Sequence, residues 1–216
     1  MATLSLPAAV LATAREMNAC GINRGAAGNV SARCDDDPAC FWITPTGMSY
    51  ADCTAEDMVK VDAGGTATGK RRPSSEWRFH RDIYAARPEA GAVVHTHSPF
   101  ATALACQRLS IPAFHYMVAR FGGDSVPCAD YATFGTQALS DAMLAALQGR
   151  SACLMAHHGM VVFGRDLRHA LDLAVELETL SEQYWRVRQL GEPQLLDADE
   201  MTRVIAKFAS YGQQSG

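Results

Sequence analysis

The chain has 216 residues, of which 48% are hydrophobic, and it carries a formal net charge of −4 at pH 7. This composition supplies enough apolar side chains for the core of one large α/β domain, and an acidic balance without a basic patch argues against a nucleic acid partner. The seven cysteines include no C-x-x-C pair, which is typical of free thiols in a reducing cytoplasm.

The first half of the chain alternates predicted helices with short predicted strands. Apolar spacing predicts a helix from about Leu6 to Asn18. No positive region precedes it, and Arg15 and Glu16 interrupt it, so we expect neither a signal peptide nor a membrane span. "GNVSAR" and "FWITPTG" predict two strands, the second running into a turn, and "MVKVDAGG" predicts one arm of a hairpin. "PSSEWRFHRDIYAARP" predicts a capped helix that ends before Pro88.

The second half of the chain continues this alternation. The strand "GAVVHTH" leads into a helix with Ser98 as its N-cap, and a loop with a short strand precedes a helix capped by Thr136. "SACLMAHHGMVVFG" predicts a strand, a glycine turn and another strand, which a long helix capped by Asp166 and a last helix near Asp197 follow. Because helices and strands interleave without a linker, we expect one α/β domain over residues 1–216.

Two histidines on the predicted strand "GAVVHTH" are candidate metal ligands. Side chains two residues apart on a strand point to the same face, so His95 and His97 share a face with their Cα atoms ~7 Å apart. That separation lets both imidazoles reach one ion. A catalytic zinc usually has three protein ligands and one open position, so the pattern predicts a third ligand elsewhere in the chain.

The segment "AHHG" offers the best third ligand. Adjacent residues on an extended chain face opposite ways, so His157 and His158 cannot both bind one ion, and alternation does not choose between them. His80 and His169 lie in predicted helices with no partner at a matching spacing, and we interpret them as surface or packing residues. Further candidates for the third ligand are His115, Asp130 and Glu76.

Three segments of small residues, "GNVS", "TPTG" and "PSSE", are candidates for an anion site. Gly28 allows a close approach of the backbone, and Asn29 and Thr46 bring polar side chains. Ser74 and Ser75 open a predicted helix, where unpaired N–H groups and the helix dipole favour an anion. Each segment alone is an ordinary cap or turn, but the three together with a His-x-His strand indicate a phosphate site.

Glu76 directly follows the two serines, in the first turn of the predicted helix. Its carboxylate either complements the helix dipole or acts as a general base beside the metal. A metal, a phosphate site and a carboxylate together suit the enolisation of a phosphorylated ketose, because the metal stabilises the enediolate while the carboxylate takes the α-proton.

Seven ordered blocks, "GAAGNVSAR", "ITPTGMSY", "PSSEWRFH", "AVVHTHS", "IPAFHYM", "CADYATFGT" and "AHHGMVVFG", resemble the class II (zinc) aldolase and adducin-head family. The resemblance covers nearly the whole chain and is strongest to the L-fuculose-phosphate aldolase branch. It implies a three-layer α/β/α fold with a mainly antiparallel central sheet. It also implies a homotetramer, a four-fold ring with active sites at the subunit interfaces, and a phosphorylated sugar substrate.

The resemblance also implies roles for individual residues. The Zn²⁺ ligands that it implies are His95, His97 and His158. It makes Glu76 the catalytic carboxylate and Tyr116 a proton donor contributed by the neighbouring subunit. The phosphate cradle that it implies consists of Gly28, Asn29, Thr46, Gly47, Ser74 and Ser75. The residues that it implies close over the substrate are Phe134, Phe208 and Tyr211.

Three departures from the family pattern stand out, and the last of them lies in a loop that is expected near the aldehyde end of the substrate. Thr96 stands where the fuculose enzyme is expected to have asparagine, "CDDDPAC" is a longer turn, and Arg120 and Phe121 follow Tyr116 where smaller residues are expected. We therefore expect glycerone phosphate as one product, with either lactaldehyde from a fuculose 1-phosphate-like ketose or acetaldehyde or its methylthio analogue from 5-deoxy- or 5-methylthio-ribulose 1-phosphate.

Other chemistry on the same site is the main alternative. A sugar-acid phosphate decarboxylase would share the glutamate, whereas the pentulose-phosphate epimerase branch carries aspartate at the position of Glu76, which argues against an epimerase. A non-catalytic adducin-like binding module would lack the metal histidines. The three histidines together with Glu76 therefore favour an aldehyde-lyase.

Overall fold

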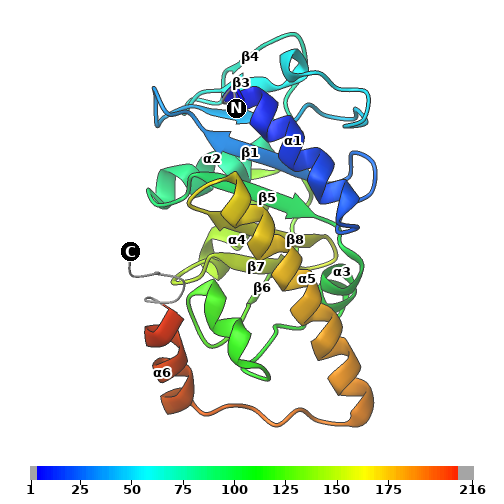
Figure 1. Cartoon of the computed structure of the whole chain (residues 1–216), viewed down its shortest axis with the longest axis vertical. Coiled ribbons are helices and arrows are strands. Elements are labelled where there is room, and N and C mark those ends of the chain that lie inside the picture. The colour runs from blue at the N-terminus through cyan, green and yellow to red at the C-terminus, as the bar shows by residue number, and fades with distance from the viewer. Residues whose placement is uncertain (1–3, 209–216) are drawn as a thin grey trace.

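An eight-stranded sheet organises the computed structural model, which describes residues 4–208 (Figure 1). The strand order is β4-β3-β2-β1-β5-β8-β7-β6, and among these strands only β6 and β7 pair in parallel. The sheet is therefore mainly antiparallel, as expected. The strands are β1 (Asn29–Arg33), β2 (Phe41–Ile43), β3 (Val59–Val61), β4 (Ala67–Thr68), β5 (Ala92–Thr96), β6 (Cys128–Ala129), β7 (Ala152–Met155) and β8 (Gly159–Gly164).

Helices cover both faces of this sheet and complete the three layers. On one face lie α1 (Leu6–Ala19), α3 (Pro99–Cys106) and α5 (Leu167–Leu190), and on the other lie α2 (Trp77–Ala86) and α4 (Gln137–Ala146) (Figure 1). The short helices η1 (Ala55–Asp57) and η2 (Tyr116–Phe121) sit in connections, and α6 (Ala198–Phe208) packs against η2. None of the helices within residues 4–208 is long and apolar enough to cross a bilayer.

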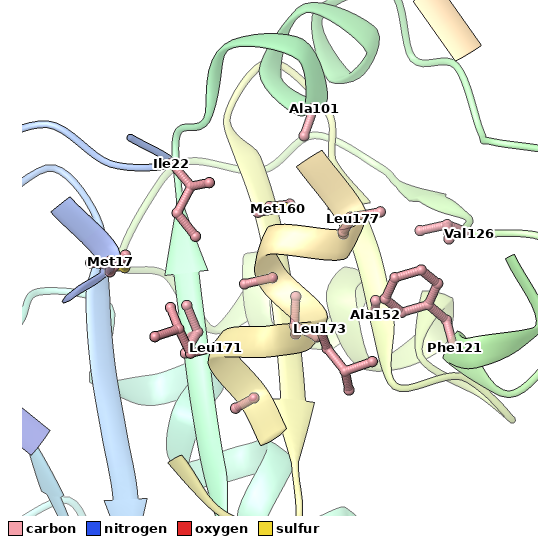
Figure 2. Close-up of a cluster of buried hydrophobic side chains, with 14 of the residues drawn as sticks. Met17, Ile22, Ala101, Phe121, Val126, Ala152, Met160, Leu171, Leu173 and Leu177 are labelled. Carbon is pink, nitrogen blue, oxygen red and sulfur yellow. The ribbon is translucent and has the colours of Figure 1, made fainter. Parts of the chain in front are cut away.

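The central strands contribute side chains to two separate hydrophobic cores, one on each face of the sheet. Val94 of β5 belongs to the core under α1, α3 and α5, whereas Val93 belongs to the core under α2 and α4. Figure 2 shows the first core, where Leu173 and Leu177 of α5 lie over Met160 of β8. Since side chains alternate along a strand, His95 shares the face of Val93 and points toward α2.

The helix caps are mostly as predicted, but at one helix a different side chain from the expected one accepts the free N–H groups. Thr136 accepts a hydrogen bond from the N–H of Leu139, and Asp166 accepts one from the N–H of His169. Ser98 does not cap α3 with its own side chain. Its hydroxyl donates instead to the carboxylate of Glu178 on α5, at 2.7 Å, and that carboxylate accepts the first free N–H groups of α3.

The start of α2 differs from the sequence expectation. The helix begins at Trp77, two residues after Ser75, and Glu76 occupies the N-cap position. Pro73 forms a β-bridge with Pro45, and the N–H of Ser74 donates to the carbonyl of Thr44 at 2.9 Å. Ser74 therefore belongs to an extended segment that pairs with another loop, and the helix starts after this pairing ends.

Candidate active site

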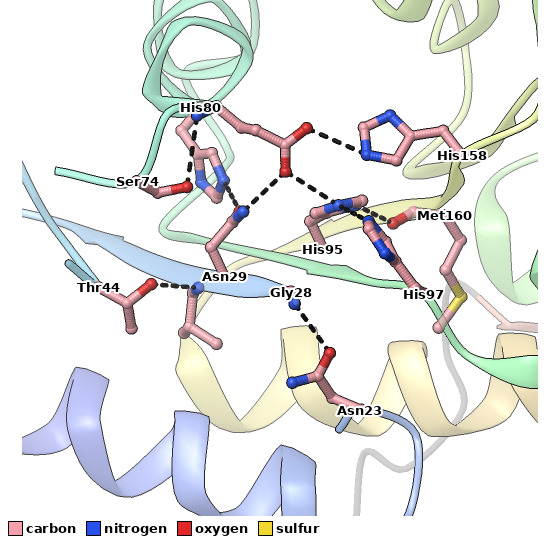
Figure 3. Close-up of polar contacts among 12 residues, drawn as sticks. Asn23, Gly28, Asn29, Thr44, Ser74, His80, His95, His97, His158 and Met160 are labelled. Atoms are coloured by element: carbon pink, nitrogen blue, oxygen red, sulfur yellow. Dashed lines mark hydrogen bonds and ion pairs between the residues drawn. The ribbon is translucent and has the colours of Figure 1, made fainter. Parts of the chain in front are cut away.

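Four side chains from three separate elements converge on the α2 face of the sheet. Glu76 comes from the N-cap of α2, His95 and His97 come from the end of β5, and His158 precedes β8. Figure 3 shows the three imidazoles turned toward one another. One potential ligand atom of each of the four residues lies within 4.8 Å of all the others. Both glutamate oxygens face imidazoles, with Oε2 3.1 Å from His95 Nε2 and Oε1 3.1 Å from His158 Nε2.

The hydrogen bond of His95 to the backbone leaves its other ring nitrogen available for a metal. His95 Nδ1 lies 2.8 Å from the carbonyl oxygen of Met160. A carbonyl only accepts, so Nδ1 carries the proton and Nε2 of the neutral ring keeps its lone pair. That Nε2 lies 3.1 Å from His97 Nε2. Glu76 Oε1 is buried without a hydrogen-bond partner among residues 4–208.

The electrostatics of the cluster also suit a divalent cation. Burial raises the pKa of the Glu76 carboxyl, but the adjacent His95 and His158 lower it by a larger amount. The net effect is a pKa below the usual range of a glutamate. Burial and the neighbouring His95 and His158 lower the pKa of His97 to about 4, so this imidazole is neutral at pH 7. The Glu76 carboxylate and the imidazole nitrogens that face it fit a metal with nitrogen and oxygen ligands.

The conformation of the turn between β7 and β8 determines whether His157 or His158 belongs to the cluster. His157 has a φ of 55°, in the left-handed region, so the chain is not extended here and the alternation rule does not apply. The turn directs His158 to Glu76 and exposes His157, whose Nε2 faces Arg108 Nε at 3.4 Å. A Cβ at Gly159 would lie 2.3 Å from the carbonyl oxygen of Thr96, so only glycine lets this turn approach β5 so closely.

The remaining candidate ligands lie elsewhere. His115 accepts a hydrogen bond from the N–H of Met117 and caps η2, and Asp130 is exposed in a loop outside the cluster. His169 sits in the first turn of α5, where its Nδ1 faces the N–H of Arg165, which agrees with the surface interpretation. His80 is not on the surface: its burial agrees with the packing alternative, and it also makes hydrogen bonds that the sequence did not lead us to expect.

His80 is fully buried and belongs to the wall of the site. Its Nε2 hydrogen-bonds to Asn29 Oδ1, and its Nδ1 lies 2.7 Å from Ser31 Oγ. The spacing of polar residues contains a signal for this contact. Glu76 and His80 are four residues apart on a helix, and Asn29 and Ser31 are two apart on a buried strand, so each pair shares a face.

The three small-residue segments lie side by side next to the cluster. Thr44 links them, because its N–H donates to the carbonyl of Val30 at 3.1 Å and its own carbonyl accepts from Ser74. Asn29 Nδ2 donates to Glu76 Oε2 at 3.0 Å, which joins the first segment to the cluster. The residues of these segments that are exposed to solvent are Thr46, Gly47 and Ser75.

Gly28 allows a close approach of the backbone, as expected, here between two strands. Its N–H donates to Asn23 Oδ1 at 2.9 Å, so this donor is already used by a side chain that the sequence analysis did not single out. A Cβ at Gly28 would lie 2.3 Å from the carbonyl oxygen of His95. The missing side chain therefore lets β1 approach β5 beside the cluster.

The expected substrate-closing residues fall in two places. Phe134 is 66% exposed, on a loop whose Gly135 carbonyl accepts a hydrogen bond from Arg78 of α2. Tyr116 stacks on Phe208 with ring centroids 6.2 Å apart, and both line a groove of about 830 Å³ between η2 and α6. The described residues that line this groove include no member of the cluster. Tyr211 lies outside the described residues.

The three residues that depart from the family pattern lie in different surroundings. Phe121 is fully buried in the core under α5, so it cannot touch an aldehyde from this position (Figure 2). Arg120 lines the groove with Tyr116 and pairs with Glu176 at 3.0 Å. Thr96 is buried, and its Oγ1 has no hydrogen-bond partner within the part of the chain that the structure describes.

Comparisons with known proteins agree with this geometry. Residues 8–185 match the model of the family described as the class II aldolase and adducin N-terminal domain. The chain is 52% identical to a 5-methylthioribulose-1-phosphate/5-deoxyribulose-1-phosphate aldolase of Rhodospirillum rubrum, over 98% of this chain and 95% of that protein. It is 44% identical to an L-fuculose phosphate aldolase of Escherichia coli, over 94% of each chain. A solved structure of an L-fuculose 1-phosphate aldolase superimposes with a TM-score of 0.92 at 33% identity, over 97% of this chain and 98% of that one. The chain belongs to the class II aldolase and adducin family.

Proposed function

We propose that this protein is a zinc-dependent aldolase that reversibly cleaves 5-methylthioribulose 1-phosphate or 5-deoxyribulose 1-phosphate. The products are glycerone phosphate and an aldehyde, methylthioacetaldehyde or acetaldehyde. The observation that carries the proposal is the convergence of His95, His97 and His158 on the carboxylate of Glu76, beside three segments suited to a phosphate. The choice of substrate rests on the 52% identity to an aldolase with these two substrates in its name.

In this proposal three histidines hold the ion and Glu76 lies within reach of it. The ligands are His95, His97 and His158, a set that leaves a position open for substrate. When bound, zinc polarises the substrate carbonyl and stabilises the negative charge that develops on its oxygen. The Met160 carbonyl fixes the tautomer of His95, so the first ligand is oriented before the ion arrives.

Glu76 transfers the proton to and from C3 of the ketose. In the cleavage direction the C4 hydroxyl gives up its proton to solvent water, the C3–C4 bond breaks as C4 becomes the aldehyde carbon, and the electron pair passes to C3 and the C2 carbonyl oxygen. Glu76, after taking up a proton from solvent, delivers it to C3, and in the synthetic direction the Glu76 carboxylate removes that same proton. The contact of Glu76 with His95 and its hydrogen bond from Asn29 support a position between the carbonyl and the phosphate ends of such a substrate.

The phosphate cradle consists of Asn29, Thr46, Gly47, Ser74 and Ser75, with Gly28 providing the close approach of β1. Ser75→Asp would fix a negative charge at the exposed side of this cradle, so we expect a strongly raised KM for a ketose 1-phosphate with the zinc content unchanged. Steady-state kinetics and metal analysis measure both quantities. Ala145→Asp adds the same charge on the exposed side of α4 and serves as the control. An unchanged KM in Ser75→Asp would remove Ser75 from the phosphate site.

We also propose that the active site is completed by a second copy of the chain in a homotetramer. Tyr116 is 51% exposed and lies in a groove that contains no member of the cluster, which supports a role in a neighbour's site. There its hydroxyl would donate a proton to the aldehyde oxygen when the C–C bond forms. Phe134, Phe208 and Tyr211 would close over the bound substrate.

Mixed oligomers test this arrangement. Tyr116→Phe and Glu76→Gln subunits are each expected to be nearly inactive alone. When they are mixed, some interfaces combine an intact Tyr116 with an intact Glu76, so partial activity should return. Co-expression with two affinity tags isolates the mixed species for assay. If verified mixed oligomers stay inactive, both residues act within one chain.

A coupled assay for glycerone phosphate tests the function itself. With the zinc-loaded protein we expect a higher kcat/KM for 5-methylthioribulose 1-phosphate and 5-deoxyribulose 1-phosphate than for L-fuculose 1-phosphate. A preference for L-fuculose 1-phosphate would show that the aldehyde is wrongly assigned. If none of the three releases glycerone phosphate, the aldolase proposal fails.

The remaining proposals concern the chain as a whole. We propose that residues 1–216 form a single domain, which the continuous sheet from β4 to β6 supports. We also propose a cytoplasmic location. All seven cysteines lie within the described residues and are free, including Cys34 and Cys40, which face each other where the β1–β2 hairpin continues beyond its paired residues.

A further inference from the structure

A column of buried polar side chains runs from the active site into the space between β1 and α2. Asn29 and Ser31 project from one face of β1. The other side of the column consists of Glu76 at the start of α2 and His80 and Tyr84 within it, which are spaced four residues apart. A spacing of two on a strand and of four on a helix keeps each set on one face. The two faces meet so that strand and helix residues alternate along the column.

Each neighbouring pair in this column is hydrogen-bonded. Asn29 Nδ2 lies 3.0 Å from Glu76 Oε2, and Asn29 Oδ1 is bonded to His80 Nε2. His80 Nδ1 lies 2.7 Å from Ser31 Oγ, and Ser31 Oγ lies 2.7 Å from the hydroxyl oxygen of Tyr84. His80 and Ser31 are both 0% exposed, so water does not compete for these bonds.

The chemistry of the groups fixes the direction of every bond. The carboxylate of Glu76 only accepts, so Asn29 must present its NH₂ group to Glu76 and its carbonyl oxygen to His80. His80 must then donate from Nε2. Its Nδ1 accepts from the Ser31 hydroxyl when the ring is neutral, and Ser31 in turn accepts from Tyr84.

The alternative tautomer of His80 would reverse this order. A proton on Nδ1 would leave Nε2 as an acceptor, and Asn29 would have to turn its NH₂ group toward His80. Its carbonyl oxygen would then face the Glu76 carboxylate, which places two acceptors in contact. Burial and the nearby His95 lower the pKa of His80 to about 3, so at pH 7 the ring is neutral and only the two tautomers compete.

We propose that His80 is a positioning residue for the aldolase reaction, which sets the orientation of the Asn29 amide and through it the position of the Glu76 carboxylate. This inference rests on the proposed function, in which Glu76 moves the proton at C3. Neither His80 nor Ser31 touches the substrate in this arrangement. The donor chain from Tyr84 to Glu76 holds the base ready before the substrate binds.

Two substitutions of His80 separate this role from a packing role. In His80→Asn the shorter amide reaches only the position of Nδ1, so the donor to Asn29 is lost. In His80→Gln the longer amide reaches the position of Nε2 and can still donate to Asn29. Ile83→Val, in the buried core contact of the same helix, loosens α2 without touching the column and serves as the control.

Kinetics of the zinc-loaded proteins on the best ketose 1-phosphate give the first readout. We expect His80→Asn to lower kcat about 10- to 100-fold, with KM and zinc content unchanged, because partners of functional groups typically contribute this much. His80→Gln should recover most of that loss, and Ile83→Val should keep the parent kcat. Parent turnover in His80→Asn, an equal loss in His80→Gln, or the same loss in Ile83→Val would overturn the proposal.

The tautomer of His80 gives a second readout that does not depend on activity. In ¹⁵N-histidine NMR spectra of the zinc-loaded parent, the resonance that disappears in His80→Gln should show protonated Nε2 and unprotonated Nδ1 at pH 7. A proton on Nδ1 would overturn the proposal. The same spectrum remains decisive if the parent cleaves none of the ketose 1-phosphates, an outcome that would instead refute the proposed function.

Discussion

Replacing Glu76 with glutamine is expected to lower turnover of the ketose 1-phosphate by about 10²- to 10⁴-fold, the usual contribution of a positioned base. The change keeps the shape of the side chain and leaves an oxygen that can accept the hydrogen bond of Asn29. It removes the basic lone pairs that would take the proton from C3. His95, His97 and His158 are untouched, so the zinc content should be retained.

Proton exchange isolates this step from the rest of the reaction. With glycerone phosphate alone in D₂O, the parent protein should exchange one of the two carbinol protons at C3 stereospecifically, and Glu76→Gln should not. NMR follows the exchange directly and needs no aldehyde. Glu182→Gln, which removes a carboxylate paired with Arg186 on α5, should exchange at the parent rate. If Glu76→Gln also exchanges at that rate, Glu76 is only a charge at the start of a helix and another group is the base.

The parts of the site that lie within one regular element could be predicted from the sequence. The two-residue period of a strand was sufficient to place His95 and His97 on one face, and both belong to the cluster. The choice between His157 and His158 was not accessible in this way. It depends on a left-handed residue in a turn, and alternation along an extended chain contains no information about such a turn.

Contacts between segments that are distant in the sequence were harder to predict. The segments around Asn29, Thr44 and Ser74 are brought together by hydrogen bonds at the ends of the interior strands β1 and β2, and their spacing in the chain does not specify that adjacency. The resemblance to a family supplied it. Asn23 shows the same limit, because it accepts the N–H of Gly28 and no pattern in the sequence indicated that contact.

His80 was missed for a different physical reason. Histidine is intermediate in its tendency to be buried, so one element alone does not decide between the surface and the core. The signal required two elements at once: polar residues two apart on a strand and four apart on a helix, each on an otherwise buried face. Such matched polar faces predict a buried network, because an unpaired polar group is costly inside a protein.

Removal of one metal ligand is expected to abolish activity, and the adjacent pair His157 and His158 provides the sharpest form of this test. His158→Ala deletes a nitrogen that lies 3.1 Å from Glu76, so the ion loses one of three imidazole ligands. Metal analysis should find little bound zinc, and neither cleavage nor proton exchange should be measurable. Chelation of the parent should abolish both activities in the same way, and added zinc should restore them.

The control is the neighbouring residue of the same type, which differs only in the direction of its side chain. His157→Asn keeps a residue that tolerates the left-handed conformation at φ 55°, so the turn that presents His158 is preserved. Because the His157 side chain faces Arg108 and Tyr131 rather than the cluster, zinc content and activity should stay close to the parent values. A protein that keeps its zinc without His158 and loses it without His157 would mean that the turn adopts the opposite arrangement when the ion is bound.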